Sequence, residues 1–167
     1  MKPGGGRGVL RFAALAIGAW TLLEPLRLGA AVLPPLQAAL TVAAEGLARL
    51  FEPAARREAL YLLNADGHAT VFVAPECVGL STIVLYLCAI AAAPGAVPRK
   101  LAAAIGGAVV LFGLSAGRIA ALHLTLTDHR ALFDNLHAEL GAILMIAAAV
   151  ALFFLAQGRA AAAAPEA

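Results

Sequence analysis

The chain changes character at Ala74-Pro75-Glu76-Cys77-Val78-Gly79-Leu80-Ser81, where a polar, turn-rich segment meets a long apolar one. Proline suits the opening of a helix, so a helix is predicted to begin at Pro75. Cys77 would then lie in the first turn, where unpaired backbone N–H groups and the helix dipole favour an anion. Because the thiolate is the nucleophilic form of cysteine, Cys77 is a candidate nucleophile. The same residue also suits a buried apolar position, and this stretch alone does not separate the two interpretations.

The composition is that of a protein embedded in a membrane. Of the 167 residues, 62% are hydrophobic and 13% are charged, and the mean hydropathy is +0.89. Soluble domains are about 45–50% apolar and about 25% charged. Alanine and leucine dominate, which favours helices over a lipid-facing barrel. The net charge of +2 gives no indication of a nucleic-acid surface.

The apolar runs predict an all-α polytopic membrane protein with one domain. Four transmembrane helices are expected, over residues 9–26, 77–97, 101–123 and 138–158. Residues 28–51 contain two prolines and several polar residues, so this segment is expected to be an interfacial helix or a re-entrant segment. The alanine-rich residues 159–167 are predicted to form a disordered tail.

The most polar internal segment, residues 52–76, is predicted to lie outside the cytoplasm. Within it, Leu60–Leu63 and His68–Val73 flank the turn signal Asn64–Gly67, which is typical of a small β-hairpin. Basic residues near the ends of the predicted spans are expected to face the cytoplasm. Those residues are Lys2, Arg7, Arg11, Arg99, Lys100 and Arg159. Arg56 and Arg57 would then lie outside, against this rule.

Three residues whose side chains could take part in catalysis are predicted to lie at the same depth in the membrane. Counted along each span from its cytoplasmic cation, Cys77 lies about 33 Å away, Arg118 about 27 Å and His137 about 33 Å. All three would therefore reach the outer membrane surface. A cysteine nucleophile site needs a cysteine with sequence-distant basic partners of this kind.

Each of these residues also has a structural interpretation. Arg118 interrupts an apolar run and is expected to face the bundle interior, although it could instead snorkel to lipid headgroups. His137 could be an exposed interfacial histidine. Three other histidines could replace it on chemistry alone: His68, His123 and His129.

The remaining candidate sites are weaker. Cys88 is interpreted as a packing residue, because about 16 Å of helix would separate it from Cys77, too far for a disulfide. Cys77, His129 and His137 lack the spacing of zinc ligands. Neither a metal nor a cofactor is predicted.

Three segments resemble the motif blocks of the exosortase/archaeosortase family: Glu76-Cys77-Val78-Gly79-Leu80, Gly117-Arg118-Ile119 and His137-Ala138-Glu139-Leu140-Gly141. The resemblance extends over about Val71 to Leu155. Members of the family are polytopic cysteine transpeptidases with an invariant Cys, Arg and His (or a second Arg). The resemblance therefore implies catalytic roles for Cys77, Arg118 and His137. This chain departs from the family at Val78, where Ser or Ala is frequent, and at Ser115, where Asn is frequent.

The resemblance implies a substrate and a location. The substrate would be an exported protein with a C-terminal sorting tag, made of a short motif, a transmembrane helix and a basic tail. Cleavage through a thioester would occur at the outer face of a prokaryotic cytoplasmic membrane, with transfer to an acceptor. Glu76 would orient His137 or Arg118, or serve only as an interfacial carboxylate. Two other classes stay open, a non-catalytic membrane scaffold and a thiol redox protein.

Overall fold

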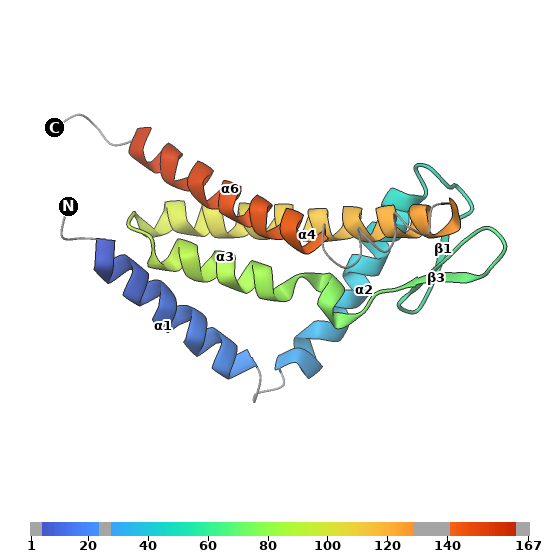
Figure 1. The fold of residues 1–167 in the computed structure, drawn as a ribbon, viewed down its shortest axis with the longest axis horizontal. Helices are drawn as coiled ribbons and strands as arrows, with labels where there is room; N and C mark the ends of the chain where they lie inside the picture. Colours follow the sequence, from blue (N-terminus) through green and yellow to red (C-terminus); the bar gives the residue numbers. More distant parts are fainter. Residues whose placement is uncertain (1–4, 24–27, 129–140, 163–167) are drawn as a thin grey trace.

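The structure, a computed structural model, describes residues 5–23, 28–128 and 141–162. The chain is mostly helical (Figure 1). The helices are α1 (Gly5–Leu23), α2 (Leu28–Ala48), α3 (Leu80–Ala92), α4 (Val97–Asp128) and α6 (Gly141–Ala162). A small sheet lies near the end of α4, and the start of α1 and the end of α6 lie at the opposite end (Figure 1).

Two of the described helices are long and apolar enough to cross a membrane. These stretches are Val97–Leu126 within α4 and Gly141–Gly158 within α6. The apolar parts of α1 and α3 are shorter, Gly8–Ala19 and Leu80–Ala92. By length and composition the helices thus suit a membrane protein, while the prediction of four crossings stays a prediction.

α4 is longer than the predicted span over residues 101–123. At 1.5 Å per residue its 32 residues extend about 48 Å, against about 30 Å of hydrocarbon in a bilayer. The first part packs on α3 and α6, and the last part packs on α2 and the sheet (Figure 1). One helix therefore joins the apolar bundle to the sheet.

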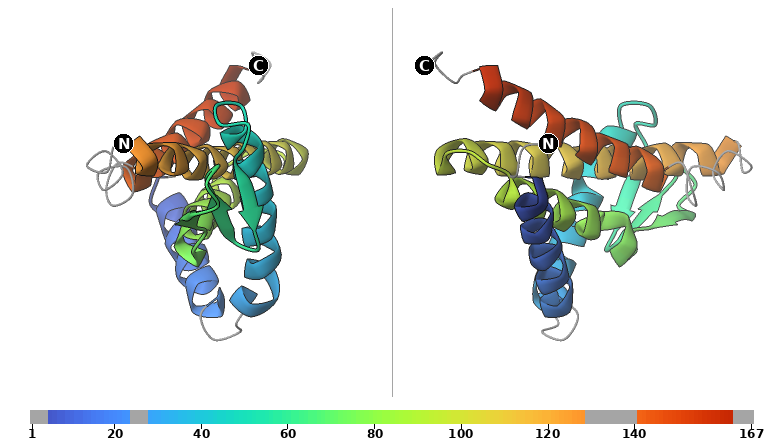
Figure 2. Two further views of the ribbon diagram at one scale, coloured as in Figure 1. Left: turned by 90° about the vertical axis from the view of Figure 1, so that its right-hand side faces the viewer. Right: turned by 60° about the vertical axis from the view of Figure 1, so that its left-hand side comes forward.

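α2 crosses the bundle instead of running along it (Figure 2). The helix begins at Leu28, continues through Pro34 and Pro35, and ends at Ala48. Its buried side, with Leu40 and Ala44, packs on α4 and the sheet. The steep crossing suits an interfacial helix, but where α2 lies relative to a bilayer stays a prediction.

The predicted continuous helix over residues 77–97 is interrupted in the structure. Residues Pro75–Val78 form a 3₁₀ turn, η1, and α3 begins only after Gly79. Gly79 adopts φ +65°, a left-handed conformation that glycine tolerates and other residues rarely adopt. At the other end, Ala93 is extended because it precedes Pro94, and Gly95 at φ +138° completes the turn into α4.

The hairpin expected over residues 60–73 forms, with an additional strand before it. β2 (Tyr61–Leu63) pairs antiparallel with both β1 (Arg56–Glu58) and β3 (Ala69–Phe72), giving the order β1-β2-β3. Leu62 lies opposite Val71, and both side chains are buried against the helices. On the outer face Tyr61 and Phe72 stack with ring centroids 5.0 Å apart. The sheet therefore has one apolar face that holds it on α2 and α4.

The outer bounds of the predicted segments also differ from the structure. α1 covers most of the first predicted span, and residues 24–26 lie outside the described residues. α6 begins at Gly141, and residues 138–140 of the last predicted span likewise lie outside them. The predicted disordered tail is helical as far as Ala162, since alanine is the strongest helix former. Residues 163–167 are not among the described residues.

The contact between α3 and α4 depends on a glycine. Tyr86 is buried and donates a hydrogen bond to the carbonyl of Ala103, at 2.8 Å. Its ring lies directly over Gly107, where an added Cβ would overlap the phenol atoms. A Cβ at the neighbouring Gly106 would meet nothing within 4 Å. Close approach of the two helices thus requires the absence of a side chain at position 107.

We predict that Gly107→Ala destabilises the protein and that Gly106→Ala does not. Overpacking at a tight contact costs about 1–3 kcal/mol, whereas glycine to alanine in an open helical position is neutral or stabilising. Thermal unfolding in detergent, followed by circular dichroism, compares the two variants. Equal unfolding midpoints would contradict the proposed fit between Tyr86 and Gly107.

Candidate active site

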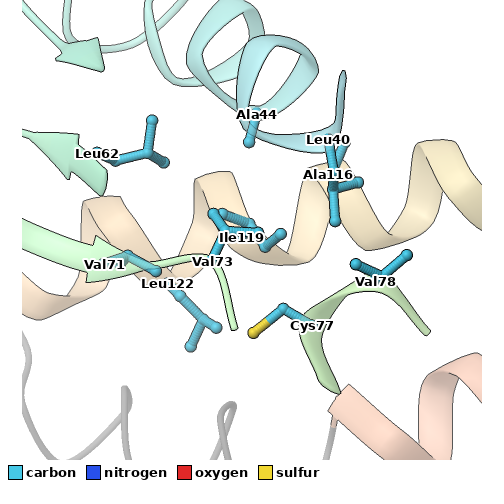
Figure 3. Close-up of a cluster of buried hydrophobic side chains, with 10 residues drawn as sticks. All are labelled: Leu40, Ala44, Leu62, Val71, Val73, Cys77, Val78, Ala116, Ile119 and Leu122. Carbon is cyan, nitrogen blue, oxygen red and sulfur yellow. The ribbon is translucent and has the colours of Figure 1, made fainter. Parts of the chain in front are cut away.

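Cys77 lies in η1, where the chain leaves the sheet and enters α3. Its backbone N–H donates to the carbonyl of Ala74 at 2.9 Å, which closes the 3₁₀ turn. The expected position in the first turn of an α-helix is therefore wrong, because α3 starts at Leu80. The residue is only 6% exposed and packs in an apolar cluster with Val73, Val78, Ile119 and Leu122 (Figure 3).

The strand that leads into η1 is held by α2. The buried Gln37 side chain donates from Nε2 to the carbonyl of Val73 at 2.8 Å. The N–H of Val73 donates to Leu60 at 2.9 Å. Both backbone polar groups of Val73 are thus bonded within an apolar core, four residues before Cys77. This arrangement fixes the direction in which the chain enters the turn.

Arg118 lies on α4, next to the residues that pack around Cys77. Ile119 directly follows it and Leu122 lies one turn further on, and both belong to the Cys77 cluster. The Arg118 side chain lies against Gly141, where an added Cβ would overlap the guanidinium group. Arg118 therefore connects the neighbourhood of Cys77 with the first residue of α6.

A groove of about 570 Å³ runs between α4 and α6 from this point. Arg118 and Gly141 line it together with small and aliphatic residues. The others that line it are Leu114, Gly117, Ala121, Leu144, Met145, Ala147, Ala148 and Ala151. Arg118 is the sole charged side chain of the groove among the residues that the structure describes, so the groove is apolar with a single cationic position.

Ser115 joins the turn of Cys77 to both helices. Its Oγ lies 3.4 Å from the carbonyl oxygen of Val78 and 3.7 Å from Sδ of Met145, and its hydroxyl hydrogen can be donated to either. A Cβ at Gly79 would come within 3.0 Å of this Oγ and 3.1 Å of Cε of Met145. The glycine after Val78 thus allows the turn to pack closely on α4 and α6.

Among the alternative histidines, His123 has a clear partner. It is fully buried on α4, and its Nε2 lies 3.0 Å from Oε2 of Glu52. The other carboxylate oxygen of Glu52 accepts from the N–H of Ala65 in the hairpin turn, at 3.0 Å. Glu52 therefore ties the hairpin to α4, which gives His123 a structural role. His68 is exposed in that turn.

The other expected participants lie beyond what the structure describes. His137 and His129 fall in residues 129–140, and the side chain of Glu76 is likewise outside the described part. His137 precedes Gly141 by four residues in the sequence, and Gly141 contacts Arg118. Within residues 5–23, 28–128 and 141–162, no group of three His, Cys, Asp or Glu side chains could hold a metal ion.

Comparison with known families gives a match over most of the chain. The family model of transmembrane exosortases matches residues 5–154. The chain belongs to the transmembrane exosortase family. This confirms the resemblance seen in the three motif segments and extends it to α1 and α2. No curated protein and no solved structure matches the chain.

For this exosortase, sequence reasoning overlooked several residues that shape the site. Gln37, Ser115 and Met145 hold the turn of Cys77, yet none of them has a chemically distinctive side chain. Gly79 and Gly141 were within the motif segments, but their role depends on contacts with other helices. Gln37, one of several polar residues in the apolar segment 28–51, was the visible signal.

We predict that Gln37→Leu increases the exposure of Cys77. The substitution leaves the buried carbonyl of Val73 without its donor, which costs about 1–3 kcal/mol. If that energy favours local opening, alkylation of Cys77 accelerates between about fivefold and a hundredfold. Maleimide labelling is measured in a Cys88→Ala background, so that one cysteine remains. Ala38→Leu, at an exposed position of the same helix, is the control, and equal rates in both variants would refute the role of Gln37.

Proposed function

We propose that this exosortase is a cysteine transpeptidase that cleaves a C-terminal sorting signal of exported membrane-anchored proteins. The observation that carries the proposal is the packing of the Cys77 turn on the α4 residues around Arg118, with Arg118 in contact with the start of α6. The proposal is that these two groups of complementary chemistry, Cys77 and Arg118, act on the same substrate. Family membership supports the same residues through their motif segments.

In the proposed reaction the Cys77 thiolate attacks the scissile carbonyl carbon. The carbonyl electron pair moves to oxygen, and the Arg118 guanidinium stabilises this oxyanion. Collapse breaks the peptide C–N bond, and His137 gives a proton to the departing amine. The product is a thioester on Cys77. An acceptor amine, or water, then attacks the thioester, His137 takes its proton, and the Cys77 thiolate leaves.

The substrate is proposed to dock through its own transmembrane helix in the groove between α4 and α6. The groove is lined by small residues such as Gly117, Ala121 and Ala148, which allow close approach of helices in membranes. Its position beside Arg118 would bring the residues that flank such a helix to the catalytic turn. Because Cys77 is only 6% exposed, docking must also displace part of its cover, and the segment of residues 52–76 is the proposed moving part.

One observation favours a second function. Cys77 is packed like a core residue among Val73, Val78 and Leu122, which is what a non-catalytic scaffold would also show. The thiol redox alternative lacks support, since Cys77 and Cys88 are both free and the second lies on α3, deeper in the bundle.

The proposed orientation puts the sheet on the outer side of a prokaryotic cytoplasmic membrane.

We predict a covalent intermediate on Cys77. The exosortase is produced with a candidate tagged substrate, quenched in acid and examined by intact mass for an adduct that hydroxylamine removes. The adduct and the processed product are expected in wild type and in Cys88→Ala, and neither is expected in Cys77→Ala. Arg118→Ala and His137→Ala should reduce processing at least about a hundredfold. Normal processing by Cys77→Ala would exclude the enzyme and favour the scaffold.

We also predict that Gly141→Ala impairs processing without unfolding the protein. Its Cβ displaces the Arg118 guanidinium, and a displacement of about 1 Å in a catalytic group lowers the rate by about a hundredfold. Gly113→Ala is the matched control, because its Cβ meets nothing within 4 Å. Processing rates are compared after the thermal midpoints of both variants have been measured. Equal rates would show that the position of Arg118 does not limit the reaction.

A further inference from the structure

Two cavities adjoin each other at the end of the molecule opposite the sheet. The first, of about 530 Å³, lies between α4 and α6, and the second, of about 340 Å³, lies at the turn between α3 and α4. Arg99, Ala103 and Ala156 line both, so the two cavities share part of their walls. Each volume falls in the range of small-molecule sites, about 300–1,000 Å³.

The cavity at the turn has a cationic wall. Arg99 and Lys100 lie in the first turn of α4 and Gln157 faces them from α6. Lys100 donates from Nζ to the carbonyl of Ala91 at 3.0 Å, and Arg99 has no hydrogen bond or ion pair with the residues that the structure describes. No Asp or Glu occurs between Glu76 and Asp128 or from Gly141 to Ala162. The cavity therefore offers positive charge that no nearby acidic residue of these helices neutralises.

The cavity between α4 and α6 is apolar and elongated. It extends along α4 from Arg99 to Val110, about 16 Å at 1.5 Å per residue. Half of a bilayer's hydrocarbon thickness is about 15 Å. Gly106, where an added Cβ would meet nothing within 4 Å, leaves room on one wall, while Leu152 and Leu155 of α6 form the other. A groove of this length that begins at a cation matches one acyl chain below its headgroup.

We propose that these two cavities form a binding site for an anionic glycerophospholipid. Its phosphate lies against Arg99 and Lys100, and one acyl chain lies in the groove between α4 and α6. Basic pockets between membrane helices bind anionic headgroups in this way. The lipid fills the gap between the two helices at the end remote from Cys77, so the site is separate from the proposed catalytic centre and does not depend on it.

The site is tested by native mass spectrometry of the full chain in detergent, with phosphatidylglycerol as the probe and phosphatidylcholine as the zwitterionic comparison. Arg99→Ala/Lys100→Ala is expected to weaken phosphatidylglycerol binding about thirtyfold, and Arg99→Gln alone about fivefold. Arg99→Gln keeps the Lys100 contact with α3 and so protects the test from misfolding. Binding at wild-type strength in Arg99→Gln and in the double variant would overturn the proposal.

The matched control for Arg99→Gln is Arg11→Gln, which removes one exposed cation of α1 that lines neither cavity. It is expected to bind phosphatidylglycerol within about threefold of wild type, since a cation outside the site has only a screened charge effect. A loss equal to that of Arg99→Gln would mean a general attraction to anionic lipid and would overturn the proposed site.

A second experiment tests whether an acyl chain occupies the groove between α4 and α6. Gly106→Leu fills the groove and is expected to weaken binding about tenfold, the equivalent of roughly two buried methylene groups. Gly113→Leu adds the same side chain at an exposed position that lines neither cavity, and it should bind normally. Inorganic phosphate should leave the lipid bound. Displacement of the lipid by phosphate, or full binding by Gly106→Leu, would indicate a simple anion site and reject the lipid.

Discussion

The close contact between the Cys77 turn and α4 is the constraint on which the site depends. It requires that Gly79 has no side chain, because Ser115 and Met145 already occupy the space where a Cβ would lie. It also requires a left-handed residue between η1 and α3, which glycine supplies at little cost. With the turn held there, the apolar residues around Cys77 share one core with the residues that flank Arg118.

Because α4 is long, it joins the site around Cys77 to the rest of the molecule. One part of the helix belongs to an apolar bundle with α3 and α6, and the other supports α2 and the sheet (Figure 1). The buried pair of His123 and Glu52 fastens the hairpin turn to the same helix. The hairpin and the Cys77 turn are therefore both supported by α4.

The two ends of the bundle differ in the charged and polar residues that they carry. Arg99 and Lys100 lie where α3 meets α4, on helices without acidic residues nearby in the sequence, while the polar hairpin occupies the opposite end (Figure 1). This asymmetry is the basis of the membrane orientation proposed above. The small residues that separate α4 from α6 serve both ends, since they leave one groove beside Arg118 and another beside Arg99. α4 and α6 are thus not closely packed at two places, and each of these places has an arginine beside it.

The sequence alone determined the membrane class, the helical content, the family and the hairpin, because apolar composition, helix-forming residues and turn signals act locally. It also indicated Cys77 and Arg118 as candidates, by chemistry and by depth. Only the tertiary structure decided that residues 77–97 break at Gly79, that a third strand forms, and that Arg118 lies against Gly141. These features depend on contacts between segments far apart in the chain, where the absence of one Cβ matters more than any local pattern.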